Sequence, residues 1–396
     1  MRKLRLGVIG LGRAFSLMVP TLAHHPLIEL VAGADVRAEA RQRFAQEFGA
    51  KAHASAEALV DDPNVDAVYI STPHELHAAQ VQLAAARGKH ILVEKPMALS
   101  LADCTAMIDA ARAAGVVLIV GPSHSFDAPI AHMRQLIAGG GFGELRMIQA
   151  LNYTDWLYRP RRPEELDPRA GGVLVNQAPH QVDVVRLIAG GNARTVRASV
   201  GAWDRARPAP AAYAAHVTFA SGAFASLTYS GFGHFDSDEF TNWIGEGGEP
   251  KDRGRYGAAR ARLAGFASAE QEASLKAATN YGGSGYGGPS ASARAVPRHH
   301  QHFGLVIASC ERADLRPTPD GVVIFDGSGV RLNPLPPPAV PRAEAIDELY
   351  DAVVDGRSPL HDGAWSRATM EVCLAMLESA QTGREVVLEH QVGLRA

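Results

Sequence analysis

Hydrophobic and polar residues follow two different patterns along this chain. Over the first 120 residues, short apolar runs of strand length are separated by longer stretches with helical spacing. Strands buried on both faces are apolar at nearly every position, so this pattern predicts a parallel sheet covered by helices on both sides. The predicted strands are residues 4–9, 28–34, 67–70, 90–93 and 116–120, and the predicted helices are residues 15–23, 38–48, 74–87 and 101–114.

Beyond residue 123 the apolar runs grow longer and alternate with polar positions, which is typical of strands with one buried face. These strands are predicted at residues 145–153, 195–201, 216–220 and 224–230. The sequence therefore predicts an α/β protein with two domains. Residues 1–123 would form a doubly wound, Rossmann-like parallel sheet, and residues 124–396 an α+β domain with a large open, mostly antiparallel sheet. The Gly/Ser-rich region 248–298 is expected to interrupt that sheet as a loop.

The composition narrows the function classes. Of 396 residues, 46% are hydrophobic and 20% charged, which is ordinary for a globular protein. A net charge of −3 gives no electrostatic reason to expect a nucleic-acid or membrane partner. Without a signal-peptide pattern or an apolar run of ~18 residues, a cytoplasmic location is expected. The three widely spaced cysteines suggest neither disulfides nor a metal site.

The ends of the first two predicted strands carry candidate cofactor chemistry. Gly10 and Gly12, in GVIGLGRAF, fit the first half of a dinucleotide fingerprint, although Phe15 stands where a third small residue is usual. Asp35 ends the second strand and suits the ribose hydroxyls of NAD. The carboxylate disfavours the 2′-phosphate of NADP, while Arg37 could pair with it. NAD is therefore the expected cofactor, with NADP less favoured.

Two further motifs follow the strands predicted at residues 67–70 and 90–93. GVIGLGR, Ala34-Asp35, STPHELH and VEKP, in this order and spacing, resemble the glucose-fructose oxidoreductase/inositol dehydrogenase (Gfo/Idh/MocA) family. The resemblance implies an NAD-dependent dehydrogenase in which Lys95 lies beside the nicotinamide and the substrate hydroxyl. The predicted cofactor contacts are Gly10, Gly12, Arg13, Ala14, Asp35, Arg37, Ser71, Thr72, Pro73, His77, Glu94 and Lys95.

A second motif, GGVLVNQAPHQVDVV, supplies candidate catalytic residues. Asn176 and His180 are four residues apart and would share one face of a continuous helix, although Pro179 could kink or restart it. The family often has Asp and His at these positions, and Asn176 replaces that Asp. Lys95 and His180 are the predicted catalytic pair, because either could relay a proton near neutral pH. His124, after the strand predicted at residues 116–120, is expected to face the same cleft.

The stretch NYTDWLYRPRRPEEL combines three arginines with three aromatic residues. Arginine matches carboxylates bidentately, and aromatic faces suit a flat ring. Together with GPSHSFDAP and SLTYSGFGHFDSDEF, this stretch resembles the phthalate dihydrodiol dehydrogenase branch of the family. A solvated basic loop or a subunit contact is the alternative for each arginine. The predicted substrate contacts are His124, Tyr153, Trp156, Tyr158, Arg159, Arg161, Arg162, Asn176 and His180.

These observations predict a dehydrogenase that oxidises a cis-dihydrodiol of phthalate to the corresponding catechol. Two alternatives stay open: a sugar or polyol dehydrogenase of the same family, and a non-catalytic protein that senses NAD. The three histidines of residues 299–302 form a weak metal-binding pattern beside the Gly-rich region, and no metal is expected. The open sheet predicts a homodimer or homotetramer, since the family pairs such sheets face to face.

Overall fold

The computed structural model describes the whole chain except residues 1, 267, 287–297 and 395–396. The chain forms two compact units. One contains Met1–Pro122, Leu275–Val296 and Ala339–Met370, and the other contains Ser123–Ser274, Pro297–Pro338 and Glu371–Ala396. These units are discontinuous in sequence, whereas the predicted domains, 1–123 and 124–396, are continuous stretches.

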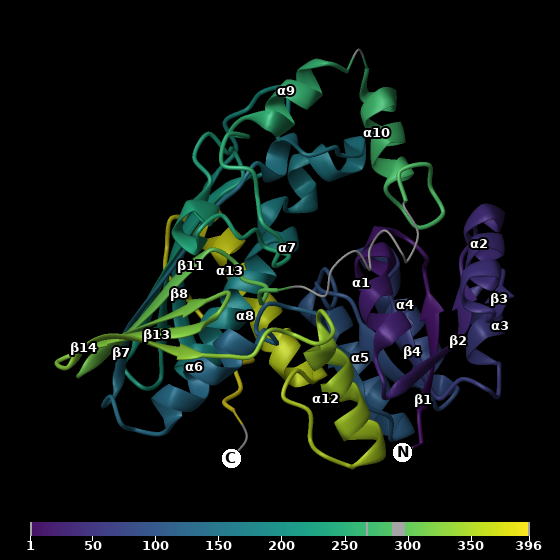
Figure 1. The fold of residues 1–396 in the computed structure, drawn as a ribbon, viewed down its shortest axis with the longest axis horizontal. Helices are drawn as coiled ribbons and strands as arrows, with labels where there is room; N and C mark the ends of the chain where they lie inside the picture. Colours follow the sequence, from purple (N-terminus) through teal and green to yellow (C-terminus); the bar gives the residue numbers. More distant parts are fainter. Residues whose placement is uncertain (1, 267, 287–297, 395–396) are drawn as a thin grey trace. The chain divides into compact units, whose positions relative to one another are not determined.

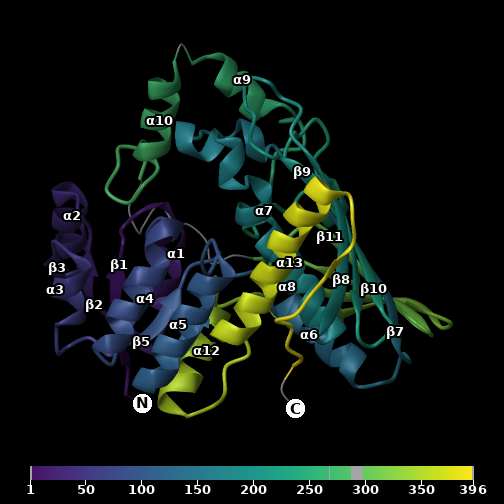
Figure 2. The same ribbon diagram turned by 180° about the vertical axis from the view of Figure 1, so that it is seen from behind.

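The first unit is built on a six-stranded parallel sheet with the strand order β3-β2-β1-β4-β5-β6 (Figure 1). Its strands are β1 (Leu4–Ile9), β2 (Ile28–Ala34), β3 (Lys51–His53), β4 (Ala67–Ile70), β5 (His90–Val93) and β6 (Leu118–Val120). Its helices are α1 (Arg13–His24), α2 (Ala38–Phe48), α3 (Ala56–Val60), α4 (His77–Ala86), α5 (Leu101–Ala114) and α12 (Ala343–Val354). The predicted doubly wound sheet is confirmed, with α4 and α5 packed side by side (Figure 2).

Local chemistry explains how this unit accommodates an imperfect glycine motif. Phe15 is completely buried and packs against Phe44, with ring centroids 6.0 Å apart. Phe44 in turn lies on Gly33, where an added Cβ would come within 2.8 Å of the Phe44 ring. Because Gly33 in β2 has no side chain, Phe44 of α2 can lie directly on this strand. Phe15 then packs beside Phe44. The helix after β1 therefore forms without the third small residue.

The second unit contains a nine-stranded sheet with the order β14-β13-β12-β11-β7-β10-β9-β8-β15. Strands β7 and β10 pair in parallel and the other neighbours pair antiparallel, which confirms the predicted mostly antiparallel sheet. The strands are β7 (Leu145–Tyr153), β8 (Ala193–Gly201), β9 (Ala212–Phe219), β10 (Phe224–Ser230), β11 (Leu305–Cys310), β12 (Ala313–Thr318), β13 (Gly321–Asp326), β14 (Gly329–Pro334) and β15 (Val386–Val387).

Helices cover one face of this sheet. Those that pack on it are α6 (Ala128–Ala138) and α8 (Ala178–Ala189). The chain also forms α7 (Val173–Asn176), α9 (Ala258–Ala264), α10 (Ala269–Ala278) and α13 (Gly363–Thr382), and the residues of α10 and α13 are divided between the two units. Short 3₁₀ turns occur in both units, at His74–Leu76, Trp156–Tyr158, Pro163–Leu166, Pro168–Ala170 and Ser237–Thr241. Helix α6 packs on β12 and β13, and α8 packs on β7 and β10, on the same side of the sheet (Figure 1).

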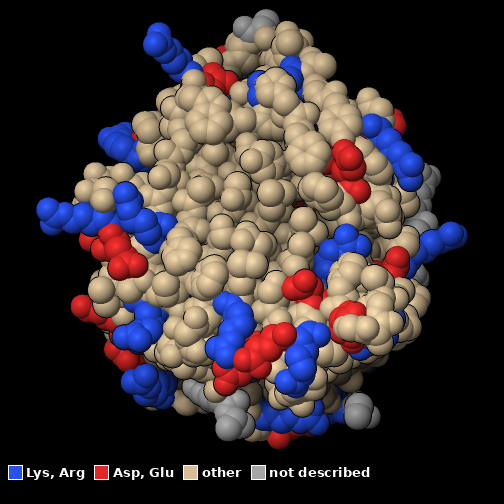
Figure 3. All heavy atoms as spheres, turned by 90° about the vertical axis from the view of Figure 1, so that its left-hand side faces the viewer, with Lys and Arg blue, Asp and Glu red and all other residues tan. Residues whose placement is uncertain are grey.

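The opposite face of the sheet remains exposed. Along β7, Ile148 and Ala150 are buried, whereas the alternating Met147 and Leu151 are partly accessible. Figure 3 views this side, and a broad central area carries no charged residues while Lys, Arg, Asp and Glu lie toward the margin. In the described residues, no helix combines the length and apolar character needed to cross a membrane.

One sequence-based prediction about this unit is wrong. Region 248–298 was expected to be a loop, but α9 and α10 occupy part of it. The Gly/Ser content that suggested a loop is concentrated after residue 280, and residues 287–297 lie outside the described part of the chain. The segment before it is rich in alanine, which favours helices.

Candidate active site

The turn after β1 has the backbone geometry of a phosphate cradle. Gly10 adopts a φ of 91°, and an added Cβ would lie 2.7 Å from the Thr72 side chain and 2.9 Å from its backbone nitrogen. An added Cβ on Gly12 would meet nothing closer than 3.9 Å. Helix α1 then begins at Arg13 without a side-chain cap, so its first N–H groups face outward. These residues fit the pyrophosphate of a dinucleotide, which binds at such helix N-termini.

The carboxylate of Asp35, at the end of β2, already accepts hydrogen bonds on both of its oxygens. The Asp35 carboxylate accepts hydrogen bonds from the Leu11 nitrogen at 2.8 Å and from the Arg37 nitrogen at 2.8 Å. The Arg37 guanidinium adds two more, from Nε at 3.0 Å and from Nη2 at 3.1 Å. Asp35 and Arg37, both predicted to touch the cofactor, therefore contact each other.

Several other predicted cofactor residues fix the shape of the strand ends. The Ser71 hydroxyl donates to the Gly10 carbonyl at 2.6 Å. His77 is completely buried, with its two ring nitrogens 3.0 Å from the Pro96 carbonyl and 3.1 Å from the Thr72 carbonyl. Desolvation lowers the pKa of His77, while the contacts with the Pro96 and Thr72 carbonyls act in the opposite direction. His77 thus joins the segment after β4 to the segment after β5.

The charged pair after β5 has two different environments. The Tyr69 hydroxyl donates to Glu94 at 2.5 Å, and both side chains are buried. Burial raises the pKa of Glu94, while the charge of Lys95 acts in the opposite direction. Lys95 is partly accessible. Glu94 is therefore held at the end of β5 by Tyr69, and the neighbouring Lys95 keeps contact with solvent.

The remaining predicted cofactor residues lie next to these. Arg13 and Ala14 form the first turn of α1, and the Arg13 guanidinium is 3.5 Å from the Thr279 carbonyl. Thr72 donates to Gln80 at 2.6 Å, and Pro73 precedes the 3₁₀ turn that leads into α4. The carboxyl ends of β1, β2, β4 and β5 thus bring the whole predicted set to one edge of the first unit, as parallel strands require.

The second unit holds a cluster of two histidines and two carboxylates. His124 lies 2.7 Å from Asp127 through Nδ1 and 3.4 Å from Glu246 through Nε2. Its ring packs against His180 with centroids 4.9 Å apart, and both rings pack on Phe303. Burial lowers the pKa of His124, but the two carboxylates outweigh it and raise the pKa to about 9. A protonated His124 therefore stands beside His180.

Sequence analysis found the two histidines of this cluster but missed Asp127, Glu246 and Phe303. The three-residue spacing of His124 and Asp127 was a usable signal, because such a pair meets in a turn. Glu246 and Phe303 are more than 100 residues away, and no local pattern connects them with His124.

The helix predicted to carry Asn176 and His180 is interrupted. Helix α7 ends at Asn176 and α8 begins at Ala178, so the two side chains do not share one continuous helical face. A new helix begins beside Pro179, which was the other possibility that the sequence offered. The Asn176 side-chain oxygen Oδ1 accepts a hydrogen bond from Trp156 Nε1 at 3.1 Å, and Asn176 therefore positions an aromatic side chain.

The three predicted arginines occupy different environments. Arg159 has a side chain 44% exposed and donates to Asp155 at 2.7 Å. Arg161 is only 9% exposed, lies 4.0 Å over the Trp156 ring and donates to the Trp156 carbonyl at 2.8 Å. Arg162 is 53% exposed and lies 3.6 Å from Glu165. Only Arg159 combines access to solvent with a place in a pocket.

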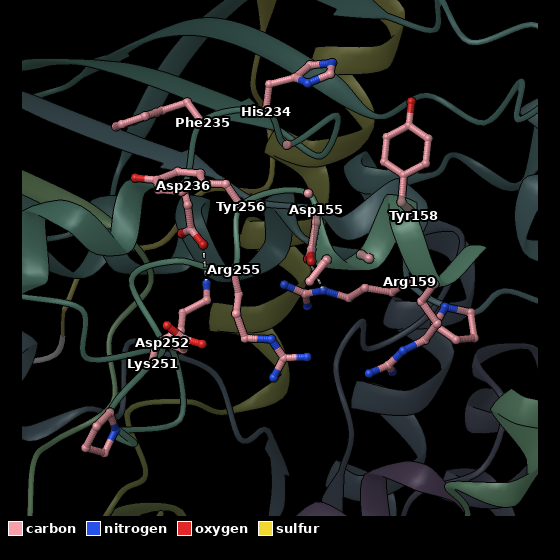
Figure 4. A pocket seen from close by; sticks show the side chains of 17 residues that line it. Asp155, Tyr158, Arg159, His234, Phe235, Asp236, Lys251, Asp252, Arg255 and Tyr256 are labelled. Carbon is pink, nitrogen blue, oxygen red and sulfur yellow. Dashed lines mark hydrogen bonds and ion pairs between the residues drawn. The ribbon is translucent and has the colours of Figure 1, made fainter. Parts of the chain in front are cut away.

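That pocket has a volume of about 350 Å³ and is lined by charged and aromatic side chains (Figure 4). Arg159 and Arg255 extend into it, and Arg262 also lines it. Lys251 forms ion pairs with two carboxylates, those of Asp236 and Asp238. Neither Arg255 nor Arg262 has a side-chain hydrogen bond or ion pair with another described residue. The pocket therefore presents guanidinium donors to an anionic ligand.

Of the three aromatic residues predicted to contact the substrate, two are buried and one is partly accessible to solvent. Trp156 and Tyr158 are buried, and Tyr158 donates to Asp204 at 2.9 Å beneath the Arg260 guanidinium. Tyr158 still contributes to the pocket wall. Tyr153 is partly accessible and packs edge-on against Phe235, another lining residue, with centroids 5.9 Å apart.

The histidines after the Gly-rich region have structural partners. His299 lies 2.6 Å from Asp320, His300 2.8 Å from the Pro336 carbonyl, and His302 2.8 Å from the Ile244 carbonyl. Across the described residues, no three His, Cys, Asp or Glu side chains are grouped as a metal site would require.

Comparison with known proteins identifies the family. A sequence model described as "Oxidoreductase family, NAD-binding Rossmann fold" matches residues 4–122, and one described as "GFO/IDH/MocA C-terminal domain" matches residues 130–249. A relative from Comamonas testosteroni is 43% identical over 382 residues, covering 96% of this chain and 95% of the relative. The chain belongs to the Gfo/Idh/MocA family. Like the family, it is an NAD-binding oxidoreductase, a dehydrogenase.

The names of similar proteins are consistent with this membership. The Comamonas protein is named a 1-carboxy-3-chloro-3,4-dihydroxycyclohexa-1,5-diene dehydrogenase. A crystal structure from Bordetella bronchiseptica RB50 is 40% identical with a TM-score of 0.91, and the match covers 97% of this chain and all of that one. A myo-inositol 2-dehydrogenase from Thermotoga maritima is 30% identical, over 47% of this chain and 55% of the relative.

Proposed function

We propose that this dehydrogenase oxidises a carboxylated cyclic cis-dihydrodiol, in particular a cis-dihydrodiol of phthalate, to the corresponding catechol. The observation that carries the proposal is the pocket in which Arg159, Arg255 and Arg262 offer guanidinium groups. Guanidinium forks bind carboxylates in bidentate fashion. The relative named for a carboxylated dihydroxycyclohexadiene covers nearly the whole chain, which supports the same substrate class.

The chemistry divides between the cofactor and the chain. When bound, NAD takes up the hydride from the ring carbinol carbon. Lys95 accepts the hydroxyl proton, and the partial accessibility of this residue beside buried Glu94 suits that role. The ketone so formed tautomerises to a catechol, and the gained aromaticity favours oxidation. In the second unit, His180 is the alternative proton acceptor, and its ring packs against that of His124.

NADH formation by the purified protein tests this function. The substrates are cyclic cis-dihydrodiols with two, one or no ring carboxylates, and myo-inositol. We expect kcat/KM to be at least about tenfold higher for the carboxylated diols, since a charged hydrogen bond is worth roughly 1.5–3 kcal/mol. The ratio of kcat/KM for the diol with two ring carboxylates to that for the diol with one decides whether phthalate or a monocarboxylate is the parent compound.

A polyol dehydrogenase is the second candidate, because a myo-inositol dehydrogenase is among the relatives. Faster turnover of myo-inositol than of any carboxylated diol would establish it. NAD binding without NADH formation from any substrate would instead favour the sensor alternative.

A further inference from the structure

Every lone-pair direction of the Asp35 carboxylate is occupied. One oxygen accepts from the Arg37 nitrogen and Nε, and the other accepts from the Leu11 nitrogen and Arg37 Nη2. A carboxylate has about four such directions. A ribose hydroxyl cannot donate to Asp35 unless one of these donors leaves, and only the guanidinium of Arg37 can leave without moving the backbone.

The guanidinium of Arg37 is held by more than Asp35. Its Nη2 also donates to the Leu11 carbonyl at 2.5 Å, within the glycine turn itself. Its Nη1 lies 3.5 Å from the carbonyl of Tyr281, a residue 244 positions further along the chain. The side chain is nevertheless 36% exposed, so solvent can receive it if these contacts break.

Tyr281 belongs to a segment, residues 279–286, that is anchored on α1 and α2. The Tyr281 ring is completely buried and lies 4.8 Å from the Phe15 ring. The hydroxyls of Tyr281 and Tyr286 both donate to Glu47, at 2.8 and 3.1 Å. These contacts fix the carbonyl that faces Arg37.

We propose that Arg37 competes with the adenosine ribose of NAD for Asp35, and that the 279–286 segment strengthens this competition. The proposal places the ribose at Asp35, as the Rossmann arrangement implies. Binding of NAD would then displace the guanidinium and loosen the segment that holds it. The displaced Arg37 remains next to the ribose, where its charge suits a 2′-phosphate. One residue would thus weaken NAD binding and allow some NADP binding.

Binding measurements on the cofactor alone test this proposal, independently of the substrate. Titration calorimetry compares Kd for NAD and NADP in the wild type, Arg37→Ala and Arg37→Gln. Because an exposed ion pair is worth up to about 1 kcal/mol, or about fivefold in Kd, we expect Arg37→Ala to tighten NAD binding by about threefold to fivefold and to weaken NADP binding. Unchanged or weaker NAD binding in both variants would overturn the proposal, because Arg37 would then be a bystander or a direct cofactor ligand.

Two comparisons sharpen the test. Arg41→Ala is the matched control, because Arg41 donates to the Asp35 and Val36 backbone carbonyls and its loss leaves the carboxylate engaged. It removes the same charge and should not tighten NAD binding. In an Asp35→Asn background the effect of Arg37→Ala should shrink toward zero, since the two substitutions act through one contact. Independent, additive effects would contradict the proposal.

Hydrogen exchange tests the role of the segment. Addition of NAD to the wild type should increase amide exchange in residues 279–286, and Glu47→Gln should raise it without cofactor. Glu47→Gln should also tighten NAD binding, although less than Arg37→Ala. If NAD instead protects this segment from exchange, the segment closes on the cofactor and the proposed competition is wrong.

Discussion

At the scale of single residues, the charged pair after β5 shows how neighbours in sequence acquire separate tasks. Glu94 is buried against Tyr69, while Lys95 stays partly accessible. Lys95→Ala should leave NAD affinity nearly intact and lower kcat by ~100-fold or more, the usual loss for a general acid or base. Steady-state kinetics and calorimetry together check this. Near wild-type turnover would exclude Lys95 as the proton acceptor and direct attention to His180.

The three arginines of residues 159–162 make a second residue-scale prediction. Arg159→Ala should reduce kcat/KM for carboxylated diols by about ten- to hundredfold and spare the uncarboxylated diol. Arg161→Ala removes a buried side chain from Trp156 and should lower the unfolding temperature while affecting both substrates alike. Arg162→Ala is the matched surface control and should change neither. Equal effects of Arg159→Ala on both substrates would remove the carboxylate assignment.

At the scale of elements, the pair of His124 and Asp127 lies at the start of α6, and Glu246 joins it from a distant loop. The pKa of His124 is raised to about 9, from about 6.5 in an unfolded chain. The folded state therefore binds the proton more tightly than the unfolded state. The resulting stabilisation is complete below pH ~6.5 and is lost as the pH rises through about 9.

Thermal unfolding across this range measures the effect. The wild type should exceed His124→Gln in unfolding temperature most at about pH 6, and the difference should shrink steadily up to pH ~9. The glutamine variant corrects for other groups that titrate in the same interval. A difference that does not vary with pH would mean that His124 is not protonated in the folded protein.

At the scale of the whole molecule, the exposed face of the nine-stranded sheet calls for a covering partner (Figure 3). Leu151 and Leu305 are directly paired across β7 and β11. Ile307 also lies on β11, and Phe224 lies on β10, the other neighbour of β7. Apolar patches of this kind mark interaction sites. We expect a homodimer or homotetramer that pairs these faces.

Light scattering coupled to size-exclusion chromatography tests this assembly. Ile307→Glu introduces a charge into the centre of the face and should shift the mass to that of a monomer. Val354→Glu, on the exposed side of α12, is the matched control and should leave the mass unchanged. A monomeric wild type would contradict the expectation directly.

The sequence by itself determined the fold class and the kind of cofactor, but the predicted strands did not include β3 or the strands from β11 to β15. Ala67–Ile70 is apolar at every position, and Leu4–Ile9 carries one charged residue, Arg5. Short runs of this kind indicate strands buried on both faces without reference to the rest of the chain. Gly10 and Asp35 were recognisable for the same reason, since a positive φ and a strand-end carboxylate are local properties. Lys95 followed from a short motif at a strand end.

Only the tertiary structure decided which of these groups are available. Three arginines within four residues are equivalent in sequence, but packing on Trp156 buries Arg161 and leaves Arg159 in the pocket. Likewise, the contact of Arg37 with Tyr281 and that of His124 with Glu246 join residues more than 100 positions apart. Burial and ion pairing depend on such distant neighbours, because charge and desolvation act through space and leave no periodic trace in the chain.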